Sequence, residues 1–283
     1  MFYVSTGDYQ KKDPYQTCID YYNIGIKNIE LSGGIHNKDS ITHLKKLNKK
    51  INFLIHNYFP PPPKPFVLNL ASLNKEISLN SYNHAINAIN YAVELNSPIY
   101  SFHGGYLIDP TINELGSKLN KVKLNNKIEA KKIFLENVNN LSDYALKKGL
   151  DLHIENNVLS LDNYNPHKSS PLLMIQASEL IDLMENTPQN VNLLIDIGHL
   201  NVSSNSVNFD KIDFLNSCNK WIQSYHLSEN SGFDDSNDKI LDNSWFWKYL
   251  KKDVKFLSLE IYGISLDEMI DQLNLLKKKY EQL

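Results

Sequence analysis

Four short apolar runs of the sequence each end on a side chain that can bind a metal ion. These endings are Glu155 in DLHIEN, Asp196 in VNLLIDIGH, His226 in WIQSYHLSE and Glu260 in VKFLSLEIY. An isolated buried carboxylate is costly unless a cation or a hydrogen-bond donor lies near it. Four such endings therefore indicate strands that converge on one site. Two further runs end in the same way, on His56 and His103.

Three carboxylates and one imidazole would form an oxygen-rich metal site with open coordination positions. Such ligands suit Mn²⁺, Mg²⁺ or Co²⁺ better than a closed tetrahedral Zn²⁺ site, although Zn²⁺ is compatible with them. We expect one divalent ion, bound by Glu155, Asp196, His226 and Glu260. The alternative for each residue is a helix N-cap or a hydrogen-bonded polar side chain. That alternative weakens when all four endings occur together, because the ends of barrel strands carry the catalytic residues.

Three other histidines are candidates for contacts to the substrate or to the metal ligands. His199 follows Asp196 by three residues in D-I-G-H, and Gly198 between them allows a tight turn. We assign His56, His103 and His199 to substrate binding or to support of the metal ligands. Each has a simpler alternative, which is a hydrogen bond at a strand end or, for His199, a cap on the next helix.

The elements that must position these side chains alternate regularly along the chain. Eight β-rich apolar runs are separated by segments with helical periodicity. The expected strands are residues 2–5, 28–31, 51–56, 99–103, 150–155, 191–196, 221–227 and 254–261. Eight strand–helix repeats predict an α/β protein with one (β/α)8 TIM barrel over residues 1–283, whose metal site lies at the carboxyl ends of the strands. The alternative is an open doubly wound sheet, which the lack of a Gly-rich loop after the first strand disfavours.

Local signals mark several ends of these elements. Asp13 precedes Pro14 as expected for an N-cap before the first helical residue, and Ser265 with Glu268 forms a capping pattern for a closing helix over 265–280. The connection after the third strand is long and contains a proline-rich segment at 60–65. We expect this segment to form one wall of the substrate pocket, since the preceding strand ends on His56.

Composition excludes several functional classes. The 283 residues carry a net charge of −3, so there is no basic field for nucleic acid and no polybasic membrane footprint. All 29 basic residues are lysines, and no arginine fork is available for a phosphate or carboxylate. No apolar run approaches the ~20 residues that span a bilayer. Two distant cysteines and the lack of a secretory signal favour the cytoplasm. A homo-oligomer is compatible with the sequence, which does not set the number of subunits.

Five motifs in their order along the chain resemble the xylose-isomerase-like TIM-barrel superfamily, which contains sugar isomerases, ketose 3-epimerases and endonuclease IV. The motifs are F-H-G-G, H-I-E-N-N, L-I-D-I-G-H-L-N, Y-H-L-S-E-N-S-G and L-E-I-Y. In the ketose epimerases of this group, the residues that match Glu155, Asp196, His226 and Glu260 bind one divalent metal. The two glutamates there also act as the acid–base pair. The resemblance therefore implies catalytic roles for Glu155 and Glu260.

The chain departs from the patterns of its relatives at two points. Relatives of endonuclease IV carry Asp-x-His after the seventh strand, where this chain has Asp235 and Asn237. The missing histidine argues against a three-metal nuclease. The epimerases usually supply an arginine from the same loop to hold substrate oxygens, and this chain has no arginine. The contacts to a sugar must therefore differ from theirs.

These observations favour a metal-dependent isomerase or epimerase that acts on a sugar or sugar phosphate by proton transfer through an enediolate. A metal that polarises a carbonyl and a carboxylate over the adjacent carbon are sufficient for that reaction, so no organic cofactor is expected. The expected partner is a small-molecule carbohydrate. One alternative is a metal-dependent phosphodiester hydrolase similar to endonuclease IV, with His56, His103 and His199 as zinc ligands. The other is a non-catalytic sugar-binding barrel.

Overall fold

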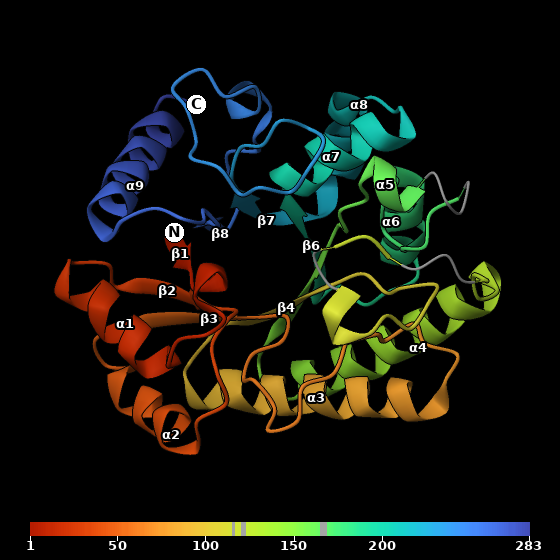
Figure 1. Ribbon diagram of the computed structural model, residues 1–283, viewed down its shortest axis with the longest axis horizontal. Coiled ribbons are helices and arrows are strands. Elements are labelled where there is room, and N and C mark those ends of the chain that lie inside the picture. Colours follow the sequence, from red (N-terminus) through yellow and green to blue (C-terminus); the bar gives the residue numbers. More distant parts are fainter. Residues whose placement is uncertain (115–116, 120–122, 165–168) are drawn as a thin grey trace.

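Eight parallel strands close into a barrel in the order of the sequence in the computed structural model, which describes residues 1–114, 117–119, 123–164 and 169–283 (Figure 1). The strands are β1 (Phe2–Ser5), β2 (Asn28–Leu31), β3 (Asn52–His56), β4 (Ile99–His103), β5 (Asp151–Glu155), β6 (Val191–Asp196), β7 (Ile222–Leu227) and β8 (Phe256–Leu259). The last strand pairs with the first, with Leu259 opposite Val4. This closure confirms the predicted barrel and excludes the open sheet.

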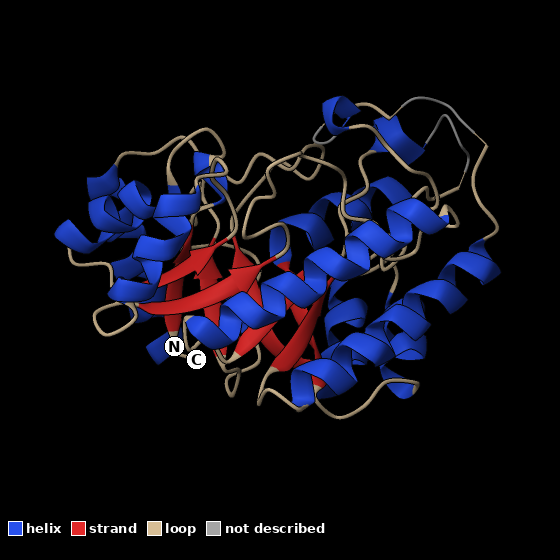
Figure 2. Ribbon diagram, turned by 90° about the horizontal axis from the view of Figure 1, so that it is seen from below, coloured by secondary structure: helices blue, strands red, loops and turns tan. Residues whose placement is uncertain are grey.

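Helices surround the barrel, and the longer loops gather above one end of it (Figure 2). The helices are α1 (Pro14–Asn23), α2 (Lys38–Leu47), α3 (Lys75–Glu94), α4 (Lys127–Leu146), α5 (Leu161–Tyr164), α6 (Ala177–Glu185), α7 (Ile197–Val207), α8 (Lys211–Cys218) and α9 (Leu266–Glu281). Short 3₁₀ turns occupy Gly7–Tyr9, Ile112–Glu114, Asn219–Trp221 and Trp247–Tyr249. None of the helices in the described ranges is long and apolar enough to cross a membrane.

Successive side chains of the strands alternate between two apolar clusters, one outside and one inside the barrel. Phe53 and Ile55 of β3, for example, belong to the large cluster that the strands share with the helices. Leu54, between them, belongs to a small separate cluster with Tyr3, Ile99 and Phe256. Because successive side chains of a strand point to opposite faces, this small cluster lies inside the barrel. It fills the amino-terminal part of the interior and leaves the carboxyl ends of the strands to polar residues.

The predicted caps and boundaries agree closely with the structure. Asp13 accepts a hydrogen bond from the backbone of Gln16, and Ser265 with Glu268 forms the complete capping box of α9. The largest boundary difference is in β8, which is shorter than the expected 254–261 at both ends. Glu260 therefore lies one residue beyond the strand, where the chain leaves the barrel.

The proline-rich connection between β3 and α3 packs against its neighbours in the fold. His36 belongs to the segment between β2 and α2, and its Nδ1 lies 2.8 Å from the carbonyl oxygen of Pro61. Tyr58 stacks on His84 of α3 with ring centroids 5.1 Å apart, and its hydroxyl accepts a hydrogen bond from the backbone of Phe66. This connection is thus held on the outer side, against α3 and the preceding connection.

Candidate metal centre and substrate cavity

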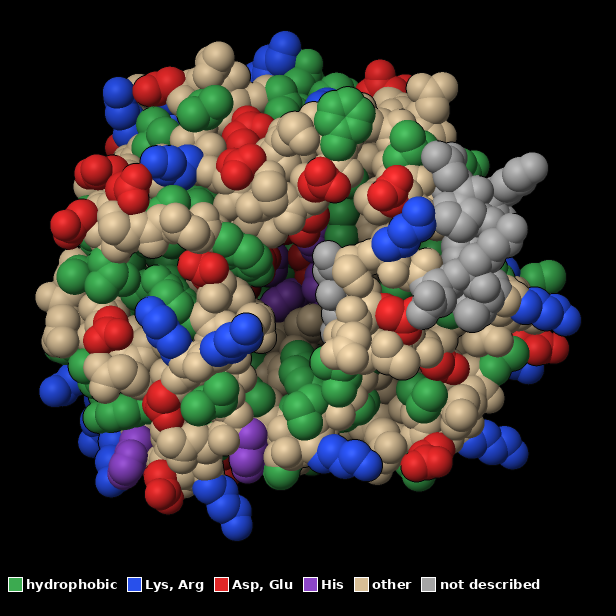
Figure 3. Space-filling model, in the orientation of Figure 1, with side chains coloured by type: hydrophobic (Ala, Val, Ile, Leu, Met, Phe, Trp, Pro, Cys, Tyr) green, Lys and Arg blue, Asp and Glu red, His purple; other side chains and the backbone are tan. Residues whose placement is uncertain are grey.

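The structure brings the four predicted metal ligands together at the carboxyl ends of β5 to β8. One ligand atom from each of Glu155, Asp196, His226 and Glu260 lies within 4.8 Å of the others. Nδ1 of His226 lies 2.8 Å from Glu260 Oε2, 3.2 Å from Glu155 Oε1 and 3.7 Å from Asp196 Oδ2. All four residues are buried. Figure 3 shows histidine and carboxylate side chains at the bottom of the central hollow.

Several polar atoms of this cluster are buried and have no hydrogen-bond partner among the residues that the structure describes. They include both carboxylate oxygens of Glu155, Oδ2 of Asp196 and Nδ1 of His226. Buried carboxylate oxygens without donors are costly, and native proteins pair almost all of them. A divalent cation would satisfy these atoms together. The residues present therefore fit such an ion, and their three carboxylates favour a metal that prefers oxygen ligands.

The ionisation of the cluster reflects how closely its charges are packed. Burial, with Asp235 and Glu155 nearby, raises the pKa of Asp196 to about 7. Burial would also lower the pKa of His226, but Glu30, Glu155 and Glu260 raise it well above its ordinary value. Burial opposes ionisation of Glu260 as well, yet the adjacent His226 lowers the pKa of that carboxyl to about 2. Without a metal, the imidazolium of His226 is thus the cation that the carboxylates surround.

The three additional histidines also reach this centre, and all of them approach Glu155. His56 Nε2 and His103 Nδ1 lie 3.3 and 3.2 Å from Glu155 Oε2, and His199 Nδ1 lies 3.6 Å from Oε1. The simpler alternative for His56, a hydrogen bond at a strand end, is also present, because its Nδ1 lies 3.0 Å from Ser101 Oγ. The structure therefore brings together every candidate site residue taken from the sequence.

The geometry of Asp196 is compatible with both roles that the sequence left as alternatives, a helix cap and a metal ligand. Its Oδ1 caps α7 by accepting a hydrogen bond from the backbone of His199 at 2.7 Å, while Oδ2 faces His226. The side chain of Asn156 bonds to the backbone N–H and C=O of Asp196 at 2.8 and 3.0 Å. These bonds fix Asp196 from the neighbouring strand end. Gly198 allows this close packing, because a Cβ there would lie 2.9 Å from Ser228 Oγ.

Two residues of the site were missed by the sequence analysis. Glu30 of β2 is fully buried, and its Oε1 lies 2.7 Å from Nε2 of His226. Tyr262 donates a hydrogen bond from its hydroxyl to Glu260 Oε1 at 2.8 Å. A signal existed for Glu30, which is a carboxylate inside the apolar strand NIEL. It does not end its strand, however, and so fell outside the pattern that predicted the metal ligands.

A cavity of about 640 Å³ opens above the cluster. His103, His199 and the predicted ligand Glu260 line it, and so does Asp235, whose Oδ2 lies 3.2 Å from His199 Nε2. The other described lining residues are Tyr106, Glu114, Ser117, Lys118, Leu119, Asn157, Val158, Ser160, Asp162, Asn163, Leu172, Asp234, Asn237 and Tyr262. The size is within the range of small-molecule sites.

The walls of this cavity differ from the prediction. The proline-rich segment at 60–65 is not among the described residues that line this cavity, so the structure gives no support to its expected role as a wall. The chain turns outward after β3, where Tyr58 anchors on His84. Gly104 and Gly105 after β4 also serve packing, because a Cβ at either position would collide with Met174 or Ala71. The connections after β4, β5 and β7 form the walls instead.

Comparison with known proteins agrees with this architecture. The chain matches the family described as the xylose isomerase-like TIM barrel over residues 23–261. An uncharacterised protein of Methanocaldococcus jannaschii is 28% identical over 174 residues, which are 61% of this chain and 52% of that protein. The match thus spans about half the length of that curated relative.

Two solved structures share the fold over nearly their whole length. A D-tagatose 3-epimerase-like protein has a TM-score of 0.73 at 20% identity, with 99% of this chain and 97% of that chain covered. D-psicose 3-epimerase of Clostridium cellulolyticum H10, solved with D-tagatose, has a TM-score of 0.63 at 13% identity, with 99% and 96% covered. At these identities the likeness establishes the fold. Because the family match covers most of the sequence, the chain belongs to the xylose isomerase-like TIM barrel family.

Proposed function

We propose that this protein is a divalent-metal-dependent isomerase or epimerase of a sugar or sugar phosphate. The observation that carries the proposal is the arrangement of Glu155 and Glu260, whose carboxylates approach Nδ1 of His226 from two different strands at 3.2 and 2.8 Å. Two carboxylates at one prospective metal position suit a proton transfer in which one removes a proton from a sugar and the other returns it. The adjoining cavity is large enough for such a substrate.

Glu155, Asp196, His226 and Glu260 would hold the ion. Once bound, a divalent metal polarises a carbonyl oxygen and makes the neighbouring C–H bond more acidic. In the proposed reaction one glutamate removes that proton. Return of a proton by the other glutamate to the opposite face of the same carbon gives epimerisation. Return to the adjacent carbon, through an enediolate, gives isomerisation.

The other residues of the site have supporting roles in this scheme. The hydrogen bond from Tyr262 keeps one oxygen of Glu260 in place. Burial lowers the pKa of His103 to about 4, so its ring is neutral at physiological pH and can hydrogen-bond to a substrate hydroxyl. Asn157 and Asn237 line the cavity, but their side-chain amides are hydrogen-bonded within the fold. Other lining groups would have to take over the contacts that an arginine makes in related epimerases.

The likeness to a 3-epimerase and to a 3-epimerase-like protein supports the reaction class without identifying a substrate. The test is solvent deuterium incorporation, measured by NMR. The Mn²⁺-loaded protein is incubated in D₂O with free and phosphorylated ketoses, and a metal-stripped sample is the control. We expect metal-dependent exchange at the carbon next to the carbonyl of at least one sugar. Tight sugar binding without any exchange would instead identify a non-catalytic sugar-binding barrel.

A second candidate function rests on a separate observation. His56, His103 and Glu155 also form a group whose ligand atoms lie within 4.8 Å of one another. Two ions that share Glu155 would suit hydrolysis of a phosphodiester, as in the two-metal phosphatases and nucleases. Elemental analysis separates the candidates, because the isomerase requires one ion per chain. Two or three zinc ions per chain, with hydrolysis of bis(p-nitrophenyl) phosphate, would favour the hydrolase.

A further inference from the structure

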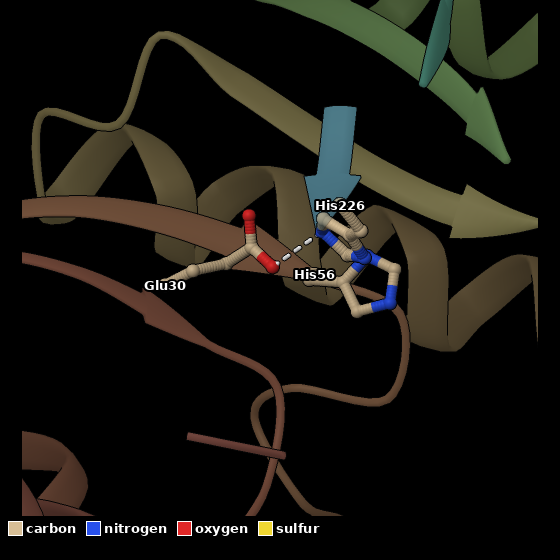
Figure 4. Close-up of side chains that lie close together, drawn as sticks. All are labelled: Glu30, His56 and His226. Carbon is tan, nitrogen blue, oxygen red and sulfur yellow. Dashed lines mark ion pairs between the residues drawn. The ribbon is translucent and has the colours of Figure 1, made fainter. Parts of the chain in front are cut away.

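Glu30 is a fully buried carboxylate inside the barrel that has no role in the scheme above. It lies on β2, and its relative exposure is 0%. A carboxylate in such a place must be paired or it destabilises the fold. Its contacts therefore indicate why it is there. Figure 4 shows that its carboxylate faces the ring of His226, and that the ring of His56 lies next to that of His226.

Each oxygen of Glu30 has one specific neighbour. Oε2 accepts a hydrogen bond from Ser258 Oγ at 2.7 Å. Ser258 is the register partner of His226 across β7 and β8, so the hydroxyl and the imidazole lie side by side in the sheet. Oε1 of Glu30 then lies 2.7 Å from Nε2 of His226. Neither of these two atoms has a hydrogen-bond partner elsewhere in the described part of the chain.

The two nitrogens of His226 consequently face different groups. Nδ1 faces Glu155, Asp196 and Glu260, whereas Nε2 faces Glu30 (Figure 4). An imidazole that binds a metal through one nitrogen carries its proton on the other. A carboxylate that accepts this proton fixes the ring orientation and makes the metal-binding nitrogen more basic.

We propose that Glu30 is a positioning residue for the metal centre. It holds His226 with Nδ1 directed at the ion, and Ser258 holds Glu30 in turn. The proposal rests on the metal site of the proposed function but not on the reaction or the sugar. It predicts that Glu30 controls metal affinity even though it does not touch the ion.

A different role for the same residues is a second ion held by Glu30, His56 and His226, whose ligand atoms also lie within 4.8 Å of one another. The contacts favour the positioning role. His56 uses Nδ1 toward Ser101 and Nε2 toward Glu155, and Glu30 Oε2 is bonded to Ser258. The two roles differ in stoichiometry, because loss of a ligand removes an ion, whereas loss of a positioning residue weakens one.

The test is titration of the metal-stripped protein with Mn²⁺ by calorimetry, without substrate. Glu30→Leu removes the acceptor with little change in volume, and Glu30→Gln keeps a neutral acceptor. We expect Glu30→Leu to weaken binding roughly 10–100-fold, as measured for other residues that support metal ligands. Glu30→Gln should recover part of the loss, and the number of ions per chain should stay the same. Ser258→Ala should weaken binding less than Glu30→Leu.

Ser224→Ala is the matched control. Like Ser258 of β8, Ser224 is a buried serine, but it lies on β7. Its Oγ lies 2.7 Å from Nδ1 of His153, which does not belong to the metal cluster. It should bind Mn²⁺ as the parent does. NMR of the Mg²⁺-loaded protein gives a spectroscopic check, because the Nε2 proton of His226 should be observed downfield in the parent and be absent in Glu30→Leu.

The possible outcomes distinguish an error in the proposed metal site from an error in the proposed role of Glu30. If the parent binds no Mn²⁺, the proposed metal site itself is wrong. If the parent binds Mn²⁺ and Glu30→Leu binds it equally well, or loses a whole ion, only the role of Glu30 is overturned. Should Glu30→Leu fail to fold, Glu30→Gln and Ser258→Ala decide. Parent-like affinity and an unchanged Nε2 signal in both variants would then reject the proposal.

Discussion

The hydroxyl of Tyr262 donates a hydrogen bond of 2.8 Å to Glu260 Oε1, which leaves Oε2 of that carboxylate directed at His226. Gly7 makes the room for this pair. A Cβ at position 7 would lie 2.4 Å from the tyrosine hydroxyl and 2.6 Å from Oε1. The connection after β1 and the chain after β8 therefore fit together to orient one of the two proposed catalytic carboxylates.

Replacement of Tyr262 by phenylalanine should lower the reaction rate and leave the metal in place. Burial and the nearby Glu260 raise the pKa of Tyr262 well above its ordinary value, so the hydroxyl stays protonated and donates at any working pH. A hydrogen bond to a charged group contributes about 1.5–3 kcal/mol, which corresponds to roughly 10–100-fold in kcat. The measurement is kcat beside Mn²⁺ affinity in the same preparation. An unchanged kcat would show that the orientation of Glu260 does not limit the reaction.

Substitution of the metal ligands should separate metal binding from folding. We expect Asp196→Asn and His226→Ala each to lower Mn²⁺ occupancy sharply, because each removes a ligand atom from the buried cluster. Both residues lie at the loop ends of their strands, where changes disturb function more than the core. Circular dichroism and elemental analysis check the two effects. Full metal content and full activity in Asp196→Asn would mean that the proposed centre is wrong.

The fold and the clustering of the four predicted ligands were predictable because both leave periodic signals in the sequence. Each strand is a short apolar run, and Glu155, Asp196, His226 and Glu260 lie at or next to the carboxyl ends of these runs. Parallel strands bring equivalent points to one end of the barrel. Sequence position alone therefore carried spatial information for these residues.

The remaining parts of the site depend on contacts that have no fixed spacing. Glu30 meets His226 and Ser258 across the barrel, and 228 positions of sequence separate Glu30 from Ser258. The position of the proline-rich segment could not be predicted for a similar reason. The segment follows Tyr58, which stacks on His84, and neither strand periodicity nor the polyproline run reveals this contact.

Stability should decrease as the pH falls from about 6.5 to about 4, in part because of His84. Burial between Tyr58 and Phe66 lowers the pKa of His84 to about 4. In this pH range the unfolded chain binds a proton at His84 and the folded chain does not, so acid favours unfolding. For a pKa near 6.5 in the unfolded state, the loss between pH 7.5 and 4.5 is ~2 kcal/mol.

The variant His84→Phe keeps an aromatic ring in this place and cannot titrate. Urea unfolding of both proteins with EDTA, at pH 7.5 and 4.5, isolates the contribution of His84 from that of the metal centre. We expect the parent to lose ~2 kcal/mol more than the variant over this interval. If both proteins lose the same free energy of unfolding, His84 is already protonated in the folded state or does not contribute to the loss of stability in acid.

In a two-base reaction, Glu155 and Glu260 should exchange protons with opposite faces of the substrate carbon. Glu→Gln at position 155 or 260 preserves size but removes the base, and loss of a general base typically costs roughly 10²–10⁴-fold in rate. Because a lost charge also weakens the ion, rates are compared at saturating Mn²⁺. A two-base epimerase allows each variant to exchange hydrogen only from the face that its surviving glutamate covers. A single-base shuttle leaves one variant fully competent in exchange. The measurement is the stereochemistry of deuterium incorporation by NMR. Parent-like turnover by both variants would show that neither glutamate is the base, and would favour the sugar-binding or hydrolase alternatives.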